Sequence, residues 1–302
     1  MLTIDPKKVS TKEFYNYLVG AVAPRPIAFA STMDKDGNPN LAPFSFFNVF
    51  SANPPILVFS PARSGQDAKS KNTLENILEV PEVVINMVNY NMVHQMSLAG
   101  IEYPKGVNEF TKAGFTPIKS EMVKPFRVKE SPAQMECKVI DIIELGKEAG
   151  AGNLVICEVL MFHLRKDVLD VHHRIDPNKI DLVARLGANW YSRTSGSALF
   201  EVSKPTSKIG IGIDQIPEYI RNSNVLTGNN LGQLGNVEKL PTSDEILEFK
   251  RSGGIDKAFE VYNIDIVSIE DHFHYVAKGL LNNGKVEEAW LVLLSEKIED
   301  RM

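Results

Sequence analysis

The chain of 302 residues is long enough for one large or two modest domains, and its apolar fraction of 43% can bury a hydrophobic core. Its 33 basic and 38 acidic residues give a formal net charge of -5, without the long basic block that a nucleic-acid footprint needs. These numbers exclude a disordered chain and favour a folded protein that binds a small molecule rather than nucleic acid.

The two cysteines, Cys137 and Cys157, lie in separate apolar segments without the C-x-x-C spacing of zinc or redox sites. The first residues, MLTIDPKKVS, lack the apolar core of a signal peptide, and the best apolar run, Leu154–Leu164, is too short to cross a bilayer. We therefore expect buried free thiols in a cytoplasmic protein that makes no membrane contact.

Short runs rich in Val, Ile and Phe dominate the first two thirds of the chain and predict strands. The predicted strands are Ile27–Thr32, Leu41–Phe47, Ile56–Ser60, Val83–Val88, Gln134–Leu145 and Leu154–Leu164. Asp36-Gly37-Asn38 favours a tight hairpin between the first two, which we expect to pair antiparallel. Longer apolar spacing predicts helices at Thr11–Leu18, Thr73–Leu78 and Val93–Ala99.

A polar stretch rich in Gly and Asn begins near Lys204 and indicates a boundary near Pro205. We expect one domain over 1–205 and a C-terminal extension over 206–302, loop-rich and then helical. Thr242-Ser243-Asp244-Glu245 is a capping box, which predicts a helix to about Arg251. The end of the chain predicts two helices joined at Asn282-Asn283-Gly284, where glycine suits a left-handed residue.

Several familiar sites are absent from the sequence. No H-E-x-x-H, G-x-S-x-G or G-x-x-x-x-G-K-[ST] motif occurs, and Gly210-Ile211-Gly212 lacks the third glycine of a dinucleotide fingerprint. The pairs His172–His173 and His272–His274 have spacings that point their side chains in different directions on a strand or a helix. We expect no metal site.

The segment 61–76 gathers cations and hydroxyl groups just before a predicted helix. They belong to Arg63, Lys69, Lys71, Ser64, Ser70 and Thr73. Together with the unpaired N–H groups of a helix N-terminus, such groups form a phosphate site. A solvated loop with Asn72 or Thr73 as an ordinary helix cap explains this segment equally well.

The stretch NPNLAPFSFFNVFSANPP, residues 38–55, mixes phenylalanine with proline and polar residues. Because Pro43 cannot donate to a ladder, the strand lies at an edge or an end there, and nearby N–H groups can face a ligand. Phe44, Phe46 and Phe47 can add apolar contacts. A ligand with a flat ring and a phosphate, such as flavin mononucleotide (FMN), fits both segments. Taken alone, this stretch fits aromatic packing in a barrel core better.

Several motifs occur in order between about residues 10 and 205, and together they resemble the flavin reductase-like family. They are RPIAFAST, PNLAPFSFFNVFSANPPILVFS, KNTLENI, VVINMV and RIDPNKIDLVARLGANWYSR. The resemblance implies a mainly β fold with helices, the FMN-binding split β-barrel of Greek-key type, here with a C-terminal helical extension. It also implies a homodimer with flavin at the subunit interface.

Carried over by position, the resemblance implies a set of residues around non-covalent FMN. Ser31 and Thr32 are expected near the ribityl or phosphate portion, and the Ala42–Phe46 backbone along the isoalloxazine edge. Arg185 and Tyr191 either reach the flavin or serve a structural role. The full expected set is Ser31, Thr32, Ala42, Pro43, Phe44, Ser45, Phe46, Ser60, Arg63, Lys71, Asn72, Thr73, Arg185 and Tyr191. Asn72 stands where many members have aspartate.

The activity implied by the resemblance is NAD(P)H-dependent flavin reduction, with hydride passed from nicotinamide to flavin and onward to free flavin, oxygen or a protein. No side chain needs to act as an acid or base, so no catalytic residue is expected. Two alternatives stay open. One is a flavoredoxin-like electron carrier with tightly bound FMN and a redox protein partner, and the other is a non-catalytic FMN-binding module.

Overall fold

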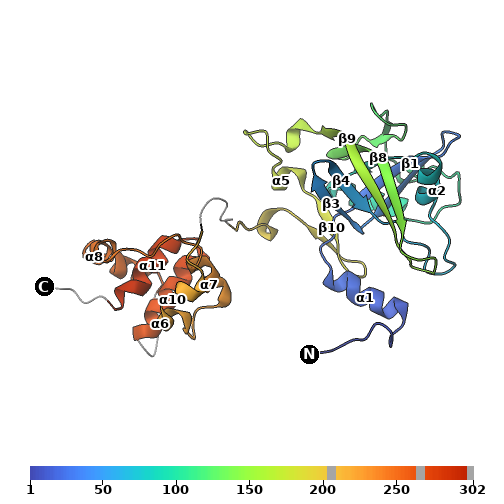
Figure 1. Cartoon of the computed structure of the whole chain (residues 1–302). Coiled ribbons are helices and arrows are strands. Elements are labelled where there is room, and N and C mark those ends of the chain that lie inside the picture. Colours follow the sequence, from blue (N-terminus) through green and yellow to red (C-terminus); the bar gives the residue numbers. More distant parts are fainter. Residues whose placement is uncertain (203–208, 263–268, 298–302) are drawn as a thin grey trace. The chain divides into compact units, whose positions relative to one another are not determined.

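The computed structural model describes residues 1–202, 209–262 and 269–297. The chain divides into two compact units, Met1–Phe200 and Glu201–Met302 (Figure 1). The first, the barrel unit, carries the strands, and the second, the helical unit, is built from helices in its described part. The boundary expected near Pro205 falls in 203–208, outside the described residues.

An antiparallel seven-stranded sheet forms the centre of the barrel unit. Its spatial order is β2 (Pro39–Phe44), β1 (Ala28–Met33), β5 (Glu82–Asn86), β8 (Ala133–Glu144), β9 (Asn153–Leu164), β4 (Pro55–Phe59) and β3 (Phe47–Ala52). The two edge strands, β2 and β3, follow each other in the chain and are joined by Ser45 and Phe46 alone. The sheet therefore curls until its edges meet at one end.

The strands follow the apolar runs closely, with one exception. The β1–β2 hairpin pairs Ala28 with Phe44 through Met33 with Pro39, and Gly37 in its turn has φ 89°, so the predicted antiparallel hairpin is confirmed. The single strand predicted over Leu41–Phe47 is wrong. The chain leaves the ladder after Phe44 and starts a separate strand at Phe47, which pairs with β4 instead of β1.

Short elements complete the barrel unit. The helices are α1 (Thr11–Ala21), α2 (Asn72–Glu79), α3 (Val93–Ala99), α4 (Glu109–Ala113) and α5 (Pro177–Ile180), with 3-10 turns η1 (Tyr90–Met92), η2 (Lys166–Val168) and η3 (Gly196–Ala198). Two small ladders pair β6 (Pro117–Ile118) with β7 (Arg127–Val128) and β10 (Val183–Arg185) with β11 (Tyr191–Arg193). The three predicted helices are confirmed, whereas α4 and α5 are too short to show a helical period.

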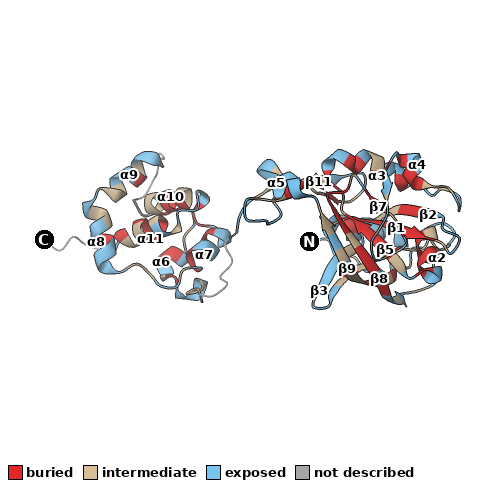
Figure 2. Cartoon of the chain, turned by 90° about the horizontal axis from the view of Figure 1, so that it is seen from above, coloured by how far each residue is buried: buried red, intermediate tan, exposed pale blue. Residues whose placement is uncertain are grey.

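Strand β1 is buried along its whole length because both faces of the sheet are covered (Figure 2). Phe29 belongs to a core cluster with Met96 and Phe110 of α3 and α4, while Ala28 and Ala30 belong to another with Leu74 of α2. Successive side chains of a strand point to opposite faces, so β1 joins two cores.

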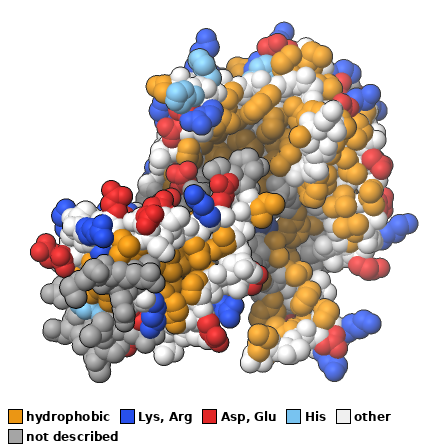
Figure 3. Space-filling view, turned by 60° about the vertical axis from the view of Figure 1, so that its left-hand side comes forward, with side chains coloured by type: hydrophobic (Ala, Val, Ile, Leu, Met, Phe, Trp, Pro, Cys, Tyr) orange, Lys and Arg blue, Asp and Glu red, His pale blue; other side chains and the backbone are white. Residues whose placement is uncertain are grey.

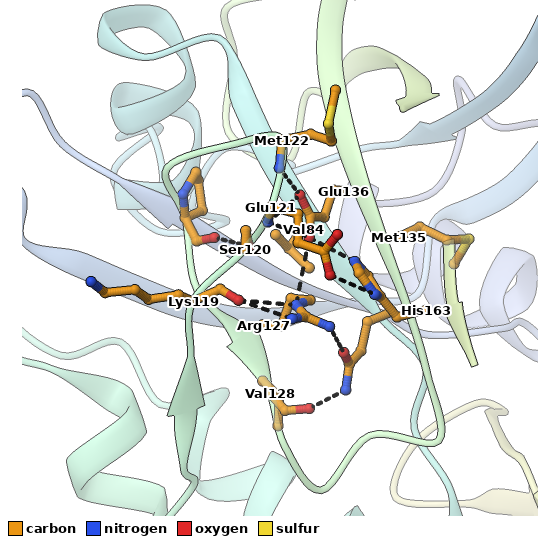
Figure 4. A network of polar contacts seen from close by, with 12 residues as sticks. Val84, Lys119, Ser120, Glu121, Met122, Arg127, Val128, Met135, Glu136 and His163 are labelled. Carbon is orange, nitrogen blue, oxygen red and sulfur yellow. Dashed lines mark hydrogen bonds and ion pairs between the residues drawn. The ribbon is translucent and has the colours of Figure 1, made fainter. Parts of the chain in front are cut away.

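A buried carboxylate ties the loop before β7 to the sheet. Glu136 of β8 is wholly buried and accepts hydrogen bonds from the backbone N–H groups of Glu121 and Met122, at 2.9 and 2.6 Å (Figure 4). His163 Nε2 lies 2.7 Å from its Oε1, and Arg127 Nε lies at 3.5 Å. A carboxylate this well bonded is satisfied away from water, which gives the cluster a structural role.

Cys137 and Cys157 are buried free thiols, as predicted, and burial raises the pKa of Cys157 to about 12. Within residues 1–202, 209–262 and 269–297, no group of three His, Cys, Asp or Glu side chains is placed to hold a metal ion. In the same residues no helix has the length and apolarity needed to span a bilayer.

The helical unit contains the short turn η4 (Ile213–Gln215) and helices that pack around Trp290. They are α6 (Glu218–Arg221), α7 (Gly228–Leu234), α8 (Ser243–Arg251), α9 (Gly254–Val261), α10 (Ile269–Asn282) and α11 (Val286–Ser295). The capping box of Thr242 and Glu245 starts α8, and Gly284 has φ 72° after α10, so both predictions are confirmed. Helices α6, α7 and α9 were not predicted: α7 is rich in glycine and asparagine, as loops are, α6 is only four residues long, and α9 has eight residues that begin with glycine.

Candidate functional site

A cavity of about 550 Å³ lies between the edge strand β2, the N-terminus of α2 and the segment that follows α3. We call it the β2–α2 cavity. Its size is that of a small-molecule site. The lining residues are Asn40, Ala42, Pro43, Phe44, Ser64, Asp67, Lys69, Ser70, Lys71, Asn72, Thr73, Ala99, Gly100, Ile101, Glu102, Tyr103, Pro104, Lys105 and Glu109.

A buried amide and hydroxyl network fixes α2 against the sheet at this cavity. The side-chain amide of Asn40 donates to Thr73 Oγ1 at 2.9 Å and to Thr32 Oγ1 at 3.3 Å. The amide of Asn76 donates to the same Thr32 oxygen at 3.2 Å. The Thr73 oxygen thus accepts a hydrogen bond from Asn40, and no described residue accepts a hydrogen bond from its hydroxyl group.

The first turn of α2 presents unpaired donors and a cation. The N–H groups of Asn72 and Thr73 have no hydrogen-bond partner among the described residues, as expected for the first residues of a helix. Lys71 at the N-cap forms an ion pair with Glu102, and burial lowers the pKa of its ammonium group. Helix donors and an ammonium group together attract an anion.

The register of β2 decides which backbone groups face outward. Leu41 N–H points away from β1, because it donates to Glu109 Oε2 at 3.1 Å. N–H groups alternate in direction along an antiparallel strand, so those of Ala42 and Phe44 face β1, and Pro43 falls where the ladder needs no donor. Within the expected Ala42–Phe46 edge, the N–H groups outside this ladder are those of Ser45 and Phe46.

Glu109 is a buried carboxyl in the cavity wall that the sequence did not reveal. It is 4% exposed, and burial raises its pKa above the usual range despite the N–H of Leu41. Its position results from the packing of α4 against β2 rather than from any local motif.

A smaller cavity of about 220 Å³, the connecting cavity, shares Pro43 and Gly100 with the β2–α2 cavity. A Cβ atom at Gly100 would lie 3.3 Å from Pro43 Cγ, so the absence of a side chain there lets the end of α3 approach β2 closely. Its other lining residues are Ile27, Ser45, Met96, Ser97, Arg185 and Tyr191.

The structure thus brings part of the expected set together. Around the β2–α2 cavity it places Ala42, Pro43, Phe44, Lys71, Asn72 and Thr73, and around the connecting cavity it places Pro43, Ser45, Arg185 and Tyr191. The remaining members, which line neither cavity, are Ser31, Thr32, Phe46, Ser60 and Arg63.

The residues off the cavities have other surroundings. Ser31 and Thr32 are buried in β1, and Ser60 Oγ accepts from Asn153 N at 3.1 Å. Arg63 Nη1 donates to Ser70 Oγ at 3.3 Å and to Ala68 O at 3.4 Å, which folds the loop before α2. Phe46 is exposed at 41% and contacts Tyr15 edge to face.

The sequence also missed the wall formed by Gly100–Lys105. This segment carries no ligand-binding motif. Its one lysine, Lys105, forms an ion pair in which Nζ lies 3.1 Å from Glu75 Oε2. Ile101 and Tyr103 supply apolar surface, and Glu102 supplies the partner of Lys71.

A flavin reductase-like domain model matches residues 20–178, which include β1–β9, α2 and the walls of the β2–α2 cavity. The chain belongs to the flavin reductase-like family. The match ends before β10 and does not include the helical unit of this flavin reductase-like protein.

Solved structures resemble the same part of the chain. Nitrilotriacetate monooxygenase component B from Bacillus cereus is 31% identical with a TM-score of 0.62, over 67% of this chain and 98% of that one. Pseudomonas fluorescens 2-nitrobenzoate 2-nitroreductase is 28% identical with a TM-score of 0.60, over 68% and 98%. The family supports an oxidoreductase that binds a flavin.

The fold class is that expected, a split barrel with helices. A protein with a split barrel domain from Shewanella frigidimarina has a TM-score of 0.56 at 22% identity, over 67% of this flavin reductase-like chain and all of its own length. At that identity the likeness shows the fold alone. The helices of the second unit complete the expected architecture.

Proposed function

We propose that this protein is an NAD(P)H-dependent flavin reductase that holds FMN non-covalently in the β2–α2 cavity. The observation that carries the proposal is the bipartite wall of that cavity. One side offers an edge strand and apolar side chains, and the other offers Lys71 with the unpaired N–H groups at the start of α2. A flat ring joined to a phosphate matches both.

The residues at the start of α2 fit a phosphate group. The N–H groups of Asn72 and Thr73 can donate to its oxygens, and the Thr73 hydroxyl can donate as well. Lys71 adds a charge-assisted bond, which is stronger than a neutral one. The phosphate has to compete with Glu102 for the ammonium group.

The residues of the edge strand fit a hydrogen-bonding ring. Carbonyl and N–H groups of one residue point the same way in an antiparallel strand, so the carbonyls of Leu41 and Pro43 face outward with the N–H of Leu41. These carbonyls can accept from a ring imide, and Ser45 N–H can donate to a ring oxygen or nitrogen. When bound, the flavin supplies the hydride chemistry, and the protein supplies position and hydrogen bonds.

The electron acceptor we propose is free flavin. The two similar structures carry different names, a monooxygenase component and a nitroreductase, so the names alone do not fix the acceptor of this protein. We find no nicotinamide motif in the sequence, and we propose that the reductant stacks on the exposed ring from the side of the connecting cavity.

We also propose that the protein is a homodimer, because the barrel unit exposes apolar side chains that a second copy can cover. Phe50 and Val49 of β3 are 69% and 63% exposed, and Phe162 of β9 and Ile140 of β8 are 51% and 50% exposed. Figure 3 shows hydrophobic side chains gathered on the visible face of this unit. Such exposed patches mark interaction surfaces. Light scattering tests this by comparing the mass of Phe50→Glu with that of the wild type. We expect a dimeric wild type and a smaller mass for the variant, and an unchanged dimer mass would show that Phe50 is not in the interface.

Spectroscopy tests the function. We expect a yellow protein, or a colourless one that binds added FMN, bleaching by NADH or NADPH alone, and steady turnover of added free flavin. If the protein does not bind FMN, the reductase, carrier and binding-module functions are all contradicted. Bleaching only with a second protein present indicates an electron carrier, and bound FMN that no reductant bleaches indicates a binding module.

A further inference from the structure

A third cavity lies beyond the connecting cavity, between the β10–β11 hairpin and the segment of η1 and α3. Its volume is about 420 Å³, and we call it the arginine cavity. It shares Ser97, Arg185 and Tyr191 with the connecting cavity, so it adjoins the side from which we propose that the reductant approaches. Its other lining residues are Tyr90, Val93, His94, Val183, Asn189, Ser192 and Arg193.

Two arginines are held over aromatic rings at this cavity. The guanidinium carbon of Arg193 lies 3.9 Å from the ring centre of Tyr90, and that of Arg185 lies 4.6 Å from the ring centre of Tyr191. Contact with a ring face orients a guanidinium group and leaves its edge free for hydrogen bonds.

Both guanidinium groups are only partly used. Arg193 donates from Nε and Nη2 to the two carboxylate oxygens of Asp181, each at 2.7 Å, and Arg185 donates from Nη1 to Trp190 O at 3.0 Å. Among residues the structure describes, none accepts a hydrogen bond from Arg193 Nη1 or Arg185 Nη2. Planar donors therefore remain available.

The rest of the wall has the character of a site for an organic anion. No carboxylate lines the arginine cavity within the described part of the chain, whereas Asp67, Glu102 and Glu109 line the β2–α2 cavity. Val93 and Val183 supply apolar surface. Ser192 Oγ is buried there without a hydrogen-bond partner among the described residues.

We propose that the arginine cavity binds a small planar organic anion, an aromatic carboxylate, next to the connecting cavity. A carboxylate matches the forked donors of arginine, and an aromatic ring matches the valine and tyrosine walls. This binding depends only on the residues of the arginine cavity, so it can be tested separately from the proposed function.

Calorimetric titration of the FMN-loaded full chain with benzoate tests the site. We expect saturable binding that Arg193→Gln weakens at least tenfold. His94→Trp gives a second test, because His94 is exposed at the cavity wall and a larger side chain there narrows the space while keeping both arginines. Arg165→Gln is the matched control, since it also removes an arginine from an exposed pair with an aspartate, and Arg165 does not line this cavity.

The outcomes separate this inference from the proposed function. Benzoate binding that both variants weaken and the control does not supports the site. A protein that binds FMN and is reduced by NAD(P)H, but either fails to bind benzoate or binds it equally well in both variants, overturns it. If FMN does not bind, the proposed function fails, and the same titration of the flavin-free chain then decides the site alone.

Discussion

Lys71 and Glu102 form an ion pair that joins the two walls of the β2–α2 cavity. Lys71 stands at the N-cap of α2 with its side chain 31% exposed, and Glu102 follows α3 with its side chain 67% exposed. The pair places a cation at the helix N-terminus and a competing anion beside it. Both charges bear on any phosphate that binds there.

Replacing the cation is expected to weaken FMN binding. Lys71→Ala removes a charge-assisted hydrogen bond, which corresponds to about 1.5–3 kcal/mol of binding free energy. Quenching of FMN fluorescence measures the change in Kd. Lys285→Ala is the control, because Lys285 also pairs with a glutamate but lies in the helical unit. Unchanged affinity in Lys71→Ala removes this residue from the phosphate site.

Replacing the competing anion is expected to have the opposite effect. Glu102→Gln keeps the shape of the side chain and releases Lys71, so FMN binds more tightly, by about 0.2–1 kcal/mol for a pair this exposed. The gain is expected to shrink as salt is added, because ions screen the interaction. Weaker binding in this variant contradicts the assigned competition.

The network between β1, β2 and α2 is expected to support the stability of the barrel unit. Asn40→Leu leaves the buried Thr73 hydroxyl without its donor and Thr32 with the amide of Asn76 alone, at a cost of about 1–3 kcal/mol in the free energy of unfolding. Urea denaturation measures the loss. Asn91→Ala, at an exposed position, is the control and is expected to change the value by less than about 0.5 kcal/mol.

The buried Glu136 is expected to make the protein sensitive to acid. Burial raises its pKa, but the N–H groups of Glu121 and Met122 and the ring of His163 outweigh this and hold the pKa below its usual value. A carboxyl with a lower pKa in the folded state stabilises above its unfolded pKa of about 4.3, and this contribution is lost as the pH falls through the folded pKa.

Urea denaturation of Glu136→Gln from pH 7 to pH 3 checks this sign. The variant is expected to be less stable than the wild type at neutral pH and to lose less stability as the pH falls. Glu148→Gln, an exposed glutamate in the turn between β8 and β9, is expected to follow the wild type. Parallel curves for wild type and Glu136→Gln contradict a lowered pKa.

The two tryptophans form a matched pair for testing the core of the helical unit. Trp290 is 1% exposed and its Nε1 donates to Leu234 O at 3.1 Å, whereas Trp190 is 73% exposed. Trp290→Ala is expected to cost about 3–5 kcal/mol in unfolding free energy. Trp190→Ala is expected to change it by less than about 0.5 kcal/mol. Denaturation followed by circular dichroism compares them, and equal effects contradict the assigned core.

Much of the fold follows from local sequence patterns, because turn residues bound most apolar runs. The helix predicted over Val93–Ala99 matches α3, and the glycine expected to end α10 has the positive φ that the prediction needs. The break after Phe44 could not be predicted in this way. Leu41–Phe47 is apolar nearly throughout, and only pairing with two different strands, β1 and β4, divides it.

The candidate site was predictable where its residues stand close together in the sequence. The strand end at Ala42–Phe44 and the helix start at Lys71–Thr73 carry recognisable chemistry and line the same cavity. Gly100–Lys105 and Glu109 reach it only because α3 and α4 pack against β2. No sequence pattern within those two segments predicts that they line the cavity.

The network of Thr32, Asn40, Thr73 and Asn76 couples the proposed binding of FMN to the folding of the barrel unit. The start of α2 is bonded to the first hairpin of the barrel rather than held on an independent loop, so melting that hairpin dismantles the anchoring residues at the same time. A ligand bound only by the folded chain adds RT ln(1 + [L]/Kd) to its stability, about 2.7 kcal/mol at a hundred times Kd. If FMN binds there as proposed, removing it is expected to lower the free energy of unfolding of the barrel unit.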